Sequence, residues 1–185
     1  MDEAKVVFPG LKIASLSAVS FLRAKAELAQ ALNLSQLRTL KLRNCRGTND
    51  RLTMLADSSE TLHLTSFELT KSRRYLDDWE LMPLVRFLES FQGLEELSLL
   101  CDGTRDPLIE EGWRSILHHC STLKRFVHHQ REVELDHEYK VITIYQHDLS
   151  EWYVQIMDLV LKTSLDCIGF CCSPKDMLQF HPTSE

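Results

Sequence analysis

Histidine and cysteine side chains, which are common zinc ligands, gather at two places in this sequence. The first group consists of His118, His119, Cys120, His128 and His129, and the second of Cys167, Cys171 and Cys172. On a helix, the adjacent histidines 118 and 119 point about 100° apart and cannot easily share one metal ion. Cys120 belongs to the apolar stripe of that helix, and the second group has no matching ligands elsewhere. We therefore expect no metal site, with a His/Cys metal-binding protein as the alternative.

Residue types needed for catalysis do not come together in a recognisable pattern. The six glycines of the chain form no loop that could cradle a phosphate. The acidic pairs Asp77-Asp78 and Glu110-Glu111 are explained as charges near the start of helices. The sequence therefore predicts a protein that is not an enzyme, has no catalytic residues and needs no cofactor.

Composition narrows the class of partner. The chain has 185 residues, with 21 basic against 27 acidic side chains and a net charge of −6. This balance argues against nucleic acid or an anionic membrane as the main partner. No apolar run is long enough to span a membrane, and the first residues contain no signal-peptide core. Six cysteines without a signal peptide are typical of reduced thiols, so we expect a cytoplasmic or nuclear protein.

A strand pattern that recurs along the chain would position the polar side chains. Residues 37–45 read L-x-x-L-x-L-x-x-C, in which Leu40 and Leu42 alternate with Lys41 and Arg43. This alternation is typical of a strand with one buried and one wet face. Its recurrence predicts six parallel strands near residues 8–14, 37–43, 59–65, 94–100, 123–129 and 165–171. In the first of these, Phe8, Leu11 and Ile13 are expected to point inward.

Helical stripes separate these strands. Helices are predicted over residues 17–32, after Asp50, after Pro83, over residues 113–120 and over residues 152–161. Polar residues 71–74 and 129–140 are expected to form loops, and residues 141–145 an extra strand. The order of strand followed by helix predicts a single α/β domain over residues 1–185, with residues 130–150 as an insertion.

Several ordered segments resemble the leucine-rich region of fungal F-box proteins. These segments are residues 31–45, 64–69, 88–97, 115–125 and 165–174. The resemblance implies a right-handed leucine-rich-repeat solenoid of about six irregular repeats, with parallel strands on the concave face and helices on the convex face. In such proteins an F-box docks on the adaptor of a cullin-type ubiquitin ligase, and the repeats hold a protein substrate. Seven residues precede Phe8, so coupling to the adaptor requires an F-box outside this chain. A truncated paralogue without ligase coupling is the alternative.

The concave strand face contains the candidate partner-binding residues. They are Lys12, Thr39, Lys41, Arg43, His63, Thr65, Glu96, Ser98 and Arg125. The N-terminal half of this face is basic on a chain that is acidic overall. It either keeps the sheet soluble or binds an acidic or phosphorylated segment of a protein substrate. We predict the second role, a protein–protein interaction.

Overall fold

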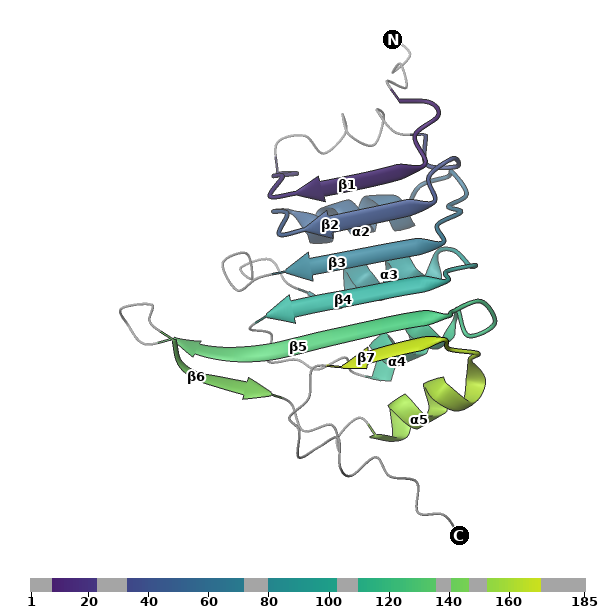
Figure 1. Cartoon of the computed structure of the whole chain (residues 1–185). Coiled ribbons are helices and arrows are strands. Elements are labelled where there is room, and N and C mark those ends of the chain that lie inside the picture. The colour runs from purple at the N-terminus through teal and green to yellow at the C-terminus, as the bar shows by residue number, and fades with distance from the viewer. Residues whose placement is uncertain are drawn as a thin grey trace.

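The structure, a computed structural model, describes residues 8–22, 33–71, 80–102, 110–135, 141–146 and 153–170. Strands and helices alternate along most of the chain. The strands are β1 (Ile13–Ser17), β2 (Thr39–Arg43), β3 (Ser66–Lys71), β4 (Glu96–Asp102), β5 (Arg125–Leu135), β6 (Val141–Gln146) and β7 (Cys167–Phe170). The helices are α2 (Thr48–Ala56), α3 (Met82–Glu89), α4 (Glu110–Leu117) and α5 (Tyr153–Lys162). The described chain is thus an α/β structure in which α2, α3 and α4 lie behind one face of a sheet (Figure 1).

The sheet is parallel except for one strand. Strands β1 to β5 follow one another in chain order, each parallel to the next. Strand β5 is long enough to have two further partners along its other edge. Its first residues, Arg125–His128, pair with β7 in parallel, and its last residues, Arg131–Leu135, pair with β6 in antiparallel orientation. Six of the described strands are therefore parallel, and β6 is the exception.

The parallel strands β2, β3, β4, β5 and β7 are all entered through the same kind of backbone contact. The carbonyl of Lys12 accepts the N–H of Arg38 at 2.8 Å and that of Thr39 at 3.0 Å. The carbonyls of Arg38, Thr65, Glu95 and Lys124 each accept two consecutive N–H groups of the next strand in the same way. These forked bonds fix the register, so residues in equivalent positions of neighbouring strands form straight rows across the sheet.

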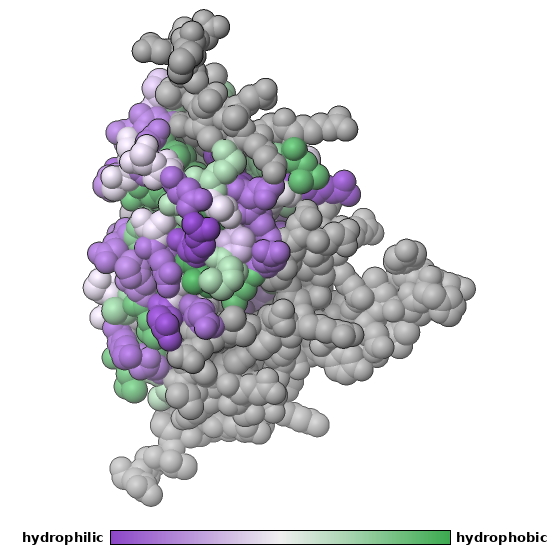
Figure 2. Space-filling model, turned by 180° about the vertical axis from the view of Figure 1, so that it is seen from behind, coloured by the Kyte–Doolittle hydropathy of each residue, from purple (hydrophilic) through white to green (hydrophobic). Residues whose placement is uncertain are grey.

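The core lies between the sheet and the helices. One row of inward side chains consists of Ala14, Leu40, Phe67, Leu97 and Phe126, all of them buried. The next row contains Leu42, Leu69, Leu99 and His128, also buried. Aromatic rings connect the sheet to the helices: Phe67 packs on Phe87 at 4.9 Å between ring centroids, and Trp113 meets Phe126 edge-on at 5.8 Å. On the helix side, the described surface is mostly polar, with apolar side chains in separate spots (Figure 2).

The register corrects the predicted phase of the first strand. The prediction placed the strand at residues 8–14 with Phe8 and Ile13 inward, but those side chains are 52% and 62% exposed. Ala14 is buried, because it pairs with Leu40 and continues the inner row. The prediction failed because Ala14 is small, so the apolar alternation in this stretch fits either phase. The repeated pattern therefore starts at Leu11.

The third strand was predicted at residues 59–65 and lies instead at β3, residues 66–71. Leu62 and Leu64 are buried as the alternation suggested, but they lie in the segment before the strand. The forked bond from Arg38 reaches Thr65 and Ser66, so the ladder begins there. Leu64, Phe67 and Leu69 therefore occupy the positions that Leu37, Leu40 and Leu42 occupy one strand earlier. The sequence pattern was therefore aligned on Leu62 and Leu64, whereas the inward residues of the strand are Phe67 and Leu69.

The described parts of the two predicted loops are in strands, while residues 72–74 and 136–140 lie outside the described part of the chain. Lys71, expected in a loop, is the buried last residue of β3. Residues 129–135, also expected in a loop, belong to β5, while the extra strand predicted at 141–145 is confirmed as β6. Of the helix predicted over 17–32, Ser17 is in β1, and residues 23–32 lie outside the described part of the chain.

Other predicted elements agree with the structure. Strands predicted at 94–100, 123–129 and 165–171 correspond to β4, the first part of β5 and β7. Pro83 lies in the first turn of α3, as its lack of a backbone N–H favours. The helix predicted after Asp50 begins before that residue, at Thr48, and its N-cap position is Gly47, whose φ of 69° is left-handed and suits glycine.

We expect Leu69→Ala and Thr70→Ala to separate the two faces of β3. Leu69 is fully buried in the inner row, so its truncation should lower the free energy of unfolding by about 2–5 kcal/mol. Thr70 points to the opposite face, so its truncation should change this energy by about 0.5 kcal/mol or less. Urea unfolding followed by circular dichroism measures both. Equal losses for the two variants would contradict the observed phase of β3.

Candidate protein-binding face

The sheet face opposite the helices, which we call the open face, presents three rows of side chains. Each of the strands β2 to β5 contributes every second residue. The members are Thr39, Lys41 and Arg43 on β2, Ser66, Glu68 and Thr70 on β3, Glu96, Ser98 and Leu100 on β4, and Arg125, Val127 and His129 on β5. All of them are half-buried except Arg125, which is exposed. Polar groups predominate near the N-terminal strands.

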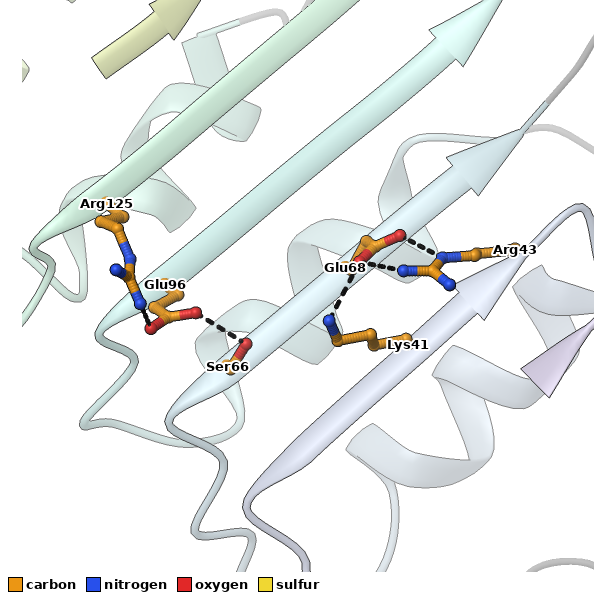
Figure 3. A network of polar contacts seen from close by, with 6 residues as sticks. All are labelled: Lys41, Arg43, Ser66, Glu68, Glu96 and Arg125. Carbon is orange, nitrogen blue, oxygen red and sulfur yellow. Dashed lines mark hydrogen bonds and ion pairs between the residues drawn. The ribbon is translucent and has the colours of Figure 1, made fainter. Parts of the chain in front are cut away.

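Lys41, Arg43 and Glu68 form an ion-pair group that we call the Glu68 cluster (Figure 3). The Arg43 guanidinium donates from Nε to one carboxylate oxygen of Glu68 and from Nη2 to the other, the latter at 2.9 Å. The Lys41 ammonium lies 3.5 Å from Glu68 Oε2. The hydrogen bond from Arg43 lowers the pKa of the Glu68 carboxyl below its usual value, and the same contact raises the pKa of Arg43. Glu68 and Arg43 therefore stay ionised near neutral pH.

A second set of ion pairs joins β4 to β5. The Glu96 carboxylate accepts a hydrogen bond from Arg125 and, at 3.3 Å, one from the Ser66 hydroxyl (Figure 3). One residue earlier, Lys124 Nζ lies 2.9 Å from Glu95 Oε2, and this contact raises the pKa of Lys124. These pairs balance the charge between β4 and β5. The Glu68 cluster keeps a net charge of +1, since two cations face one carboxylate.

Six of the nine predicted partner-binding residues lie in these rows. They are Thr39, Lys41, Arg43, Glu96, Ser98 and Arg125. Lys12 is exposed and comes just before β1, beside the basic strand β2. His63 and Thr65 precede β3 and lie outside the rows, because the predicted phase of that strand was wrong. The structure thus brings the six residues together on one face of the sheet, without His63 and Thr65.

Glu68 is the residue that the sequence prediction missed. With the third strand predicted to end at residue 65, Glu68 fell outside it. The signal that places it was present: Leu64-Thr65-Ser66-Phe67-Glu68-Leu69 repeats the pattern of Leu37 to Leu42, with Glu68 at the position of Lys41. Glu68 changes the charge of the predicted face, because one carboxylate between two cations halves the local positive charge.

The histidine and cysteine group is dispersed in the structure. His119 is buried and donates its Nε2 proton to the Leu88 carbonyl at 3.0 Å, while His118 is exposed. His128 is buried in the inner row, as predicted, against Trp113 and Phe126. Within the described residues, no three histidine, cysteine or acidic side chains are arranged to hold a metal ion.

Burial changes the protonation of His119. Loss of solvation, with a smaller contribution from the neighbouring His118, lowers the pKa of His119 to about 4. The ring is therefore neutral at neutral pH, with its proton on Nε2 because the Leu88 carbonyl can only accept. It packs 5.1 Å from the Phe91 ring and acts as part of the core.

Comparisons with known proteins identify no relative. The chain matches no protein-family model, and neither curated proteins nor solved structures gave a match. None of the helices in the described ranges is long and apolar enough to cross a lipid bilayer.

Replacing Glu68 with glutamine should lower the free energy of unfolding most at neutral pH. The folded protein lowers the pKa of Glu68, so its stabilising contribution exists above the usual carboxyl pKa and disappears as pH falls through the lowered value. Because Glu68 is partly solvated, the loss at pH 7 should be about 1 kcal/mol. Urea unfolding at several pH values should show the gap to wild type narrowing in acid. Glu89→Gln, on the exposed surface of α3, is the control and should show no such pattern.

We expect the buried His119 to make the free energy of unfolding depend on pH between about pH 4 and pH 6.5. There the unfolded chain binds a proton that the folded chain excludes, so stability increases with pH across this window. The total change should be about 1–3 kcal/mol, and His119→Gln should flatten it while keeping a donor for Leu88. His63→Gln, at an exposed position, should leave the wild-type slope unchanged. An unchanged slope in His119→Gln, measured by thermal unfolding, would contradict the neutral buried imidazole.

Proposed function

We propose that this chain is a leucine-rich-repeat module for protein–protein interaction, similar to the substrate-recognition part of a fungal F-box protein. The observation that carries this proposal is the forked bond that recurs at the entrances of β2, β3, β4, β5 and β7. A contact that recurs with the same donors and acceptors is what a chain of structural repeats produces.

The corrected register supports a repeat more strongly than the sequence did. Paired residues of successive strands are Ile13, Thr39, Ser66, Glu96 and Arg125, which are 26, 27, 30 and 29 residues apart. These intervals are close to the length of the longer leucine-rich repeats. The step to Cys167 on β7 is 42 residues, because β6 and α5 come between. In the proposed solenoid, the strands form the concave face and the helices the convex face.

The open face suits binding because its charged groups are oriented but not saturated. A guanidinium carries five N–H groups and an ammonium three. Arg43 uses two and Lys41 one on Glu68, so three and two remain, with no further partner among the described residues. These groups can donate to a carboxylate or phosphoryl group of a protein segment that lies across the strands.

The cellular setting follows from the same proposal. Among the described residues, Cys45, Cys120 and Cys167 form no disulfide, which supports a reducing compartment such as the cytoplasm or nucleus. As in the F-box proteins that the chain resembles, the module would present a captured protein to a ubiquitin ligase. Contact with the ligase adaptor would be made by an F-box outside this chain.

Neutralising the cations of the Glu68 cluster should remove partner capture. The double variant Lys41→Gln, Arg43→Gln should capture at least about tenfold less partner, because charge-assisted hydrogen bonds at a half-buried site are lost. The measurement is a pull-down from a fungal extract at two salt concentrations, quantified by mass spectrometry.

The matched control is Arg86→Gln, Lys162→Gln, at exposed positions of α3 and α5. These side chains also belong to ion pairs, with Asp57 at 2.7 Å and Asp158 at 2.8 Å, so the control removes the same charge and the same kind of contact. It should keep the partners. Loss of the same proteins in both variants, with both folded by circular dichroism, would show that the open face is only a solvated surface.

A further inference from the structure

Towards the C-terminal strands, two apolar side chains join the outward rows, beside the ion pair of Glu96 with Arg125. Leu100 on β4 and Val127 on β5 are half-buried members of the outward rows. Gly169 on β7 pairs with Val127, and a methyl group at that position would lie 3.4 Å from the Val127 side chain. Because glycine carries no such group, residue 169 places no side chain against this flank of Val127. We call Leu100, Val127 and Gly169 the apolar patch.

Neither the Glu68 cluster nor the apolar patch can bind a ligand tightly by itself. The cluster carries a net charge of +1, and its cations are 34% and 43% exposed at Lys41 and Arg43. Contacts with charges at this exposure are screened by water and are individually weak. Leu100 and Val127 by themselves are too small an area for specific docking. One ligand that reaches both sites gains from each without a second loss of translational freedom.

Between the two sites, the surface is low and polar. Thr70 on β3 and Ser98 on β4 separate the Glu68 cluster from the apolar patch. Their short side chains let a peptide backbone approach the sheet, and their hydroxyls can donate to or accept from it. The sheet therefore offers a continuous path from cation to apolar surface across the strands.

We propose that the partner is an extended segment of another protein, with an anionic side chain on the Glu68 cluster and an apolar side chain four residues away on the apolar patch. This inference rests on the proposed function and specifies its ligand. Neighbouring strands are about 4.8 Å apart, so the distance from β2 to a point between β4 and β5 is about 12 Å. An extended chain covers this distance in about 3.6 residues, at about 3.3 Å per residue. Side chains of such a chain alternate in direction, so an even separation is required, and four is the even number that fits.

Fluorescence polarisation with labelled synthetic peptides tests the spacing. The peptides place one glutamate and one leucine in a serine and threonine background, in both orders, separated by three, four or five positions. The separation of four should bind about tenfold more tightly than three or five, or than a peptide with serine instead of leucine, as expected for losing one half-buried leucine contact. Phosphoserine in place of glutamate distinguishes a phosphoryl from a carboxylate ligand, and lysine in its place should abolish binding.

Two protein variants test the apolar patch. Leu100→Ser should bind the peptides with separations of three, four and five equally weakly, because the leucine contact is gone. Leu161→Ser is the control: Leu161 is 78% exposed on α5, so its replacement removes a similar apolar surface from another part of the protein. This control should keep the preference for a separation of four.

The outcomes separate this inference from the proposed function. Acidic peptides that bind equally at all separations, and equally to Leu100→Ser, would overturn the four-residue spacing while leaving an acidic protein partner in place. Absence of binding by every peptide would also overturn it, and the pull-down with Lys41→Gln, Arg43→Gln would then decide whether the open face binds a protein at all.

Discussion

One backbone carbonyl before each of the strands β1 to β5 accepts two consecutive N–H groups at the entrance of the next parallel strand, and the rest of the sheet depends on this contact. A parallel ladder has no tight turn to set its register, since each crossover is long. The forked bond supplies the missing constraint at the strand entrance. Once the carbonyl of Arg38 holds the N–H groups of Thr65 and Ser66, Phe67 must face the core and Glu68 must face outward. A slip by one residue would exchange the two faces of the strand.

Register also determines the electrostatics of the open face. Strand β2 presents cations, β3 presents Glu68, β4 presents Glu96, and β5 presents Arg125, so charges of opposite sign meet on neighbouring strands. Like charges in those positions would repel and weaken the pairing. The same ion pairs hold long side chains in defined positions before any partner arrives. Each pair is a modest contribution to stability and a larger one to the shape of the surface.

Sequence alone located two strands in which large apolar residues mark both inward positions. This holds for Leu40 and Leu42 on β2 and for Leu97 and Leu99 on β4. It failed where a small residue takes an inward position, as Ala14 does, and where buried leucines continue outside the strand, as Leu62 and Leu64 do. Most of the candidate face was predictable because its cations lie on the best-marked strand. The neutralising role of Glu68 was not, because it depends on the relative register of two strands that are far apart in sequence.

The pairing of β7 with β5 affects the order in which the sheet folds. The pairs from β1 to β5 join residues 26 to 30 positions apart, and β5 with β6 forms a hairpin whose contacts are nearer still. The pairing of β5 with β7 spans 42 residues and uses only four positions on each strand. Closing a longer loop costs more conformational entropy, and here it is followed by fewer hydrogen bonds. We therefore expect β7 to dock late in folding and to detach early in unfolding. Gly169 lies on this last and least secured strand, so one side of the apolar patch is completed only when folding is otherwise finished.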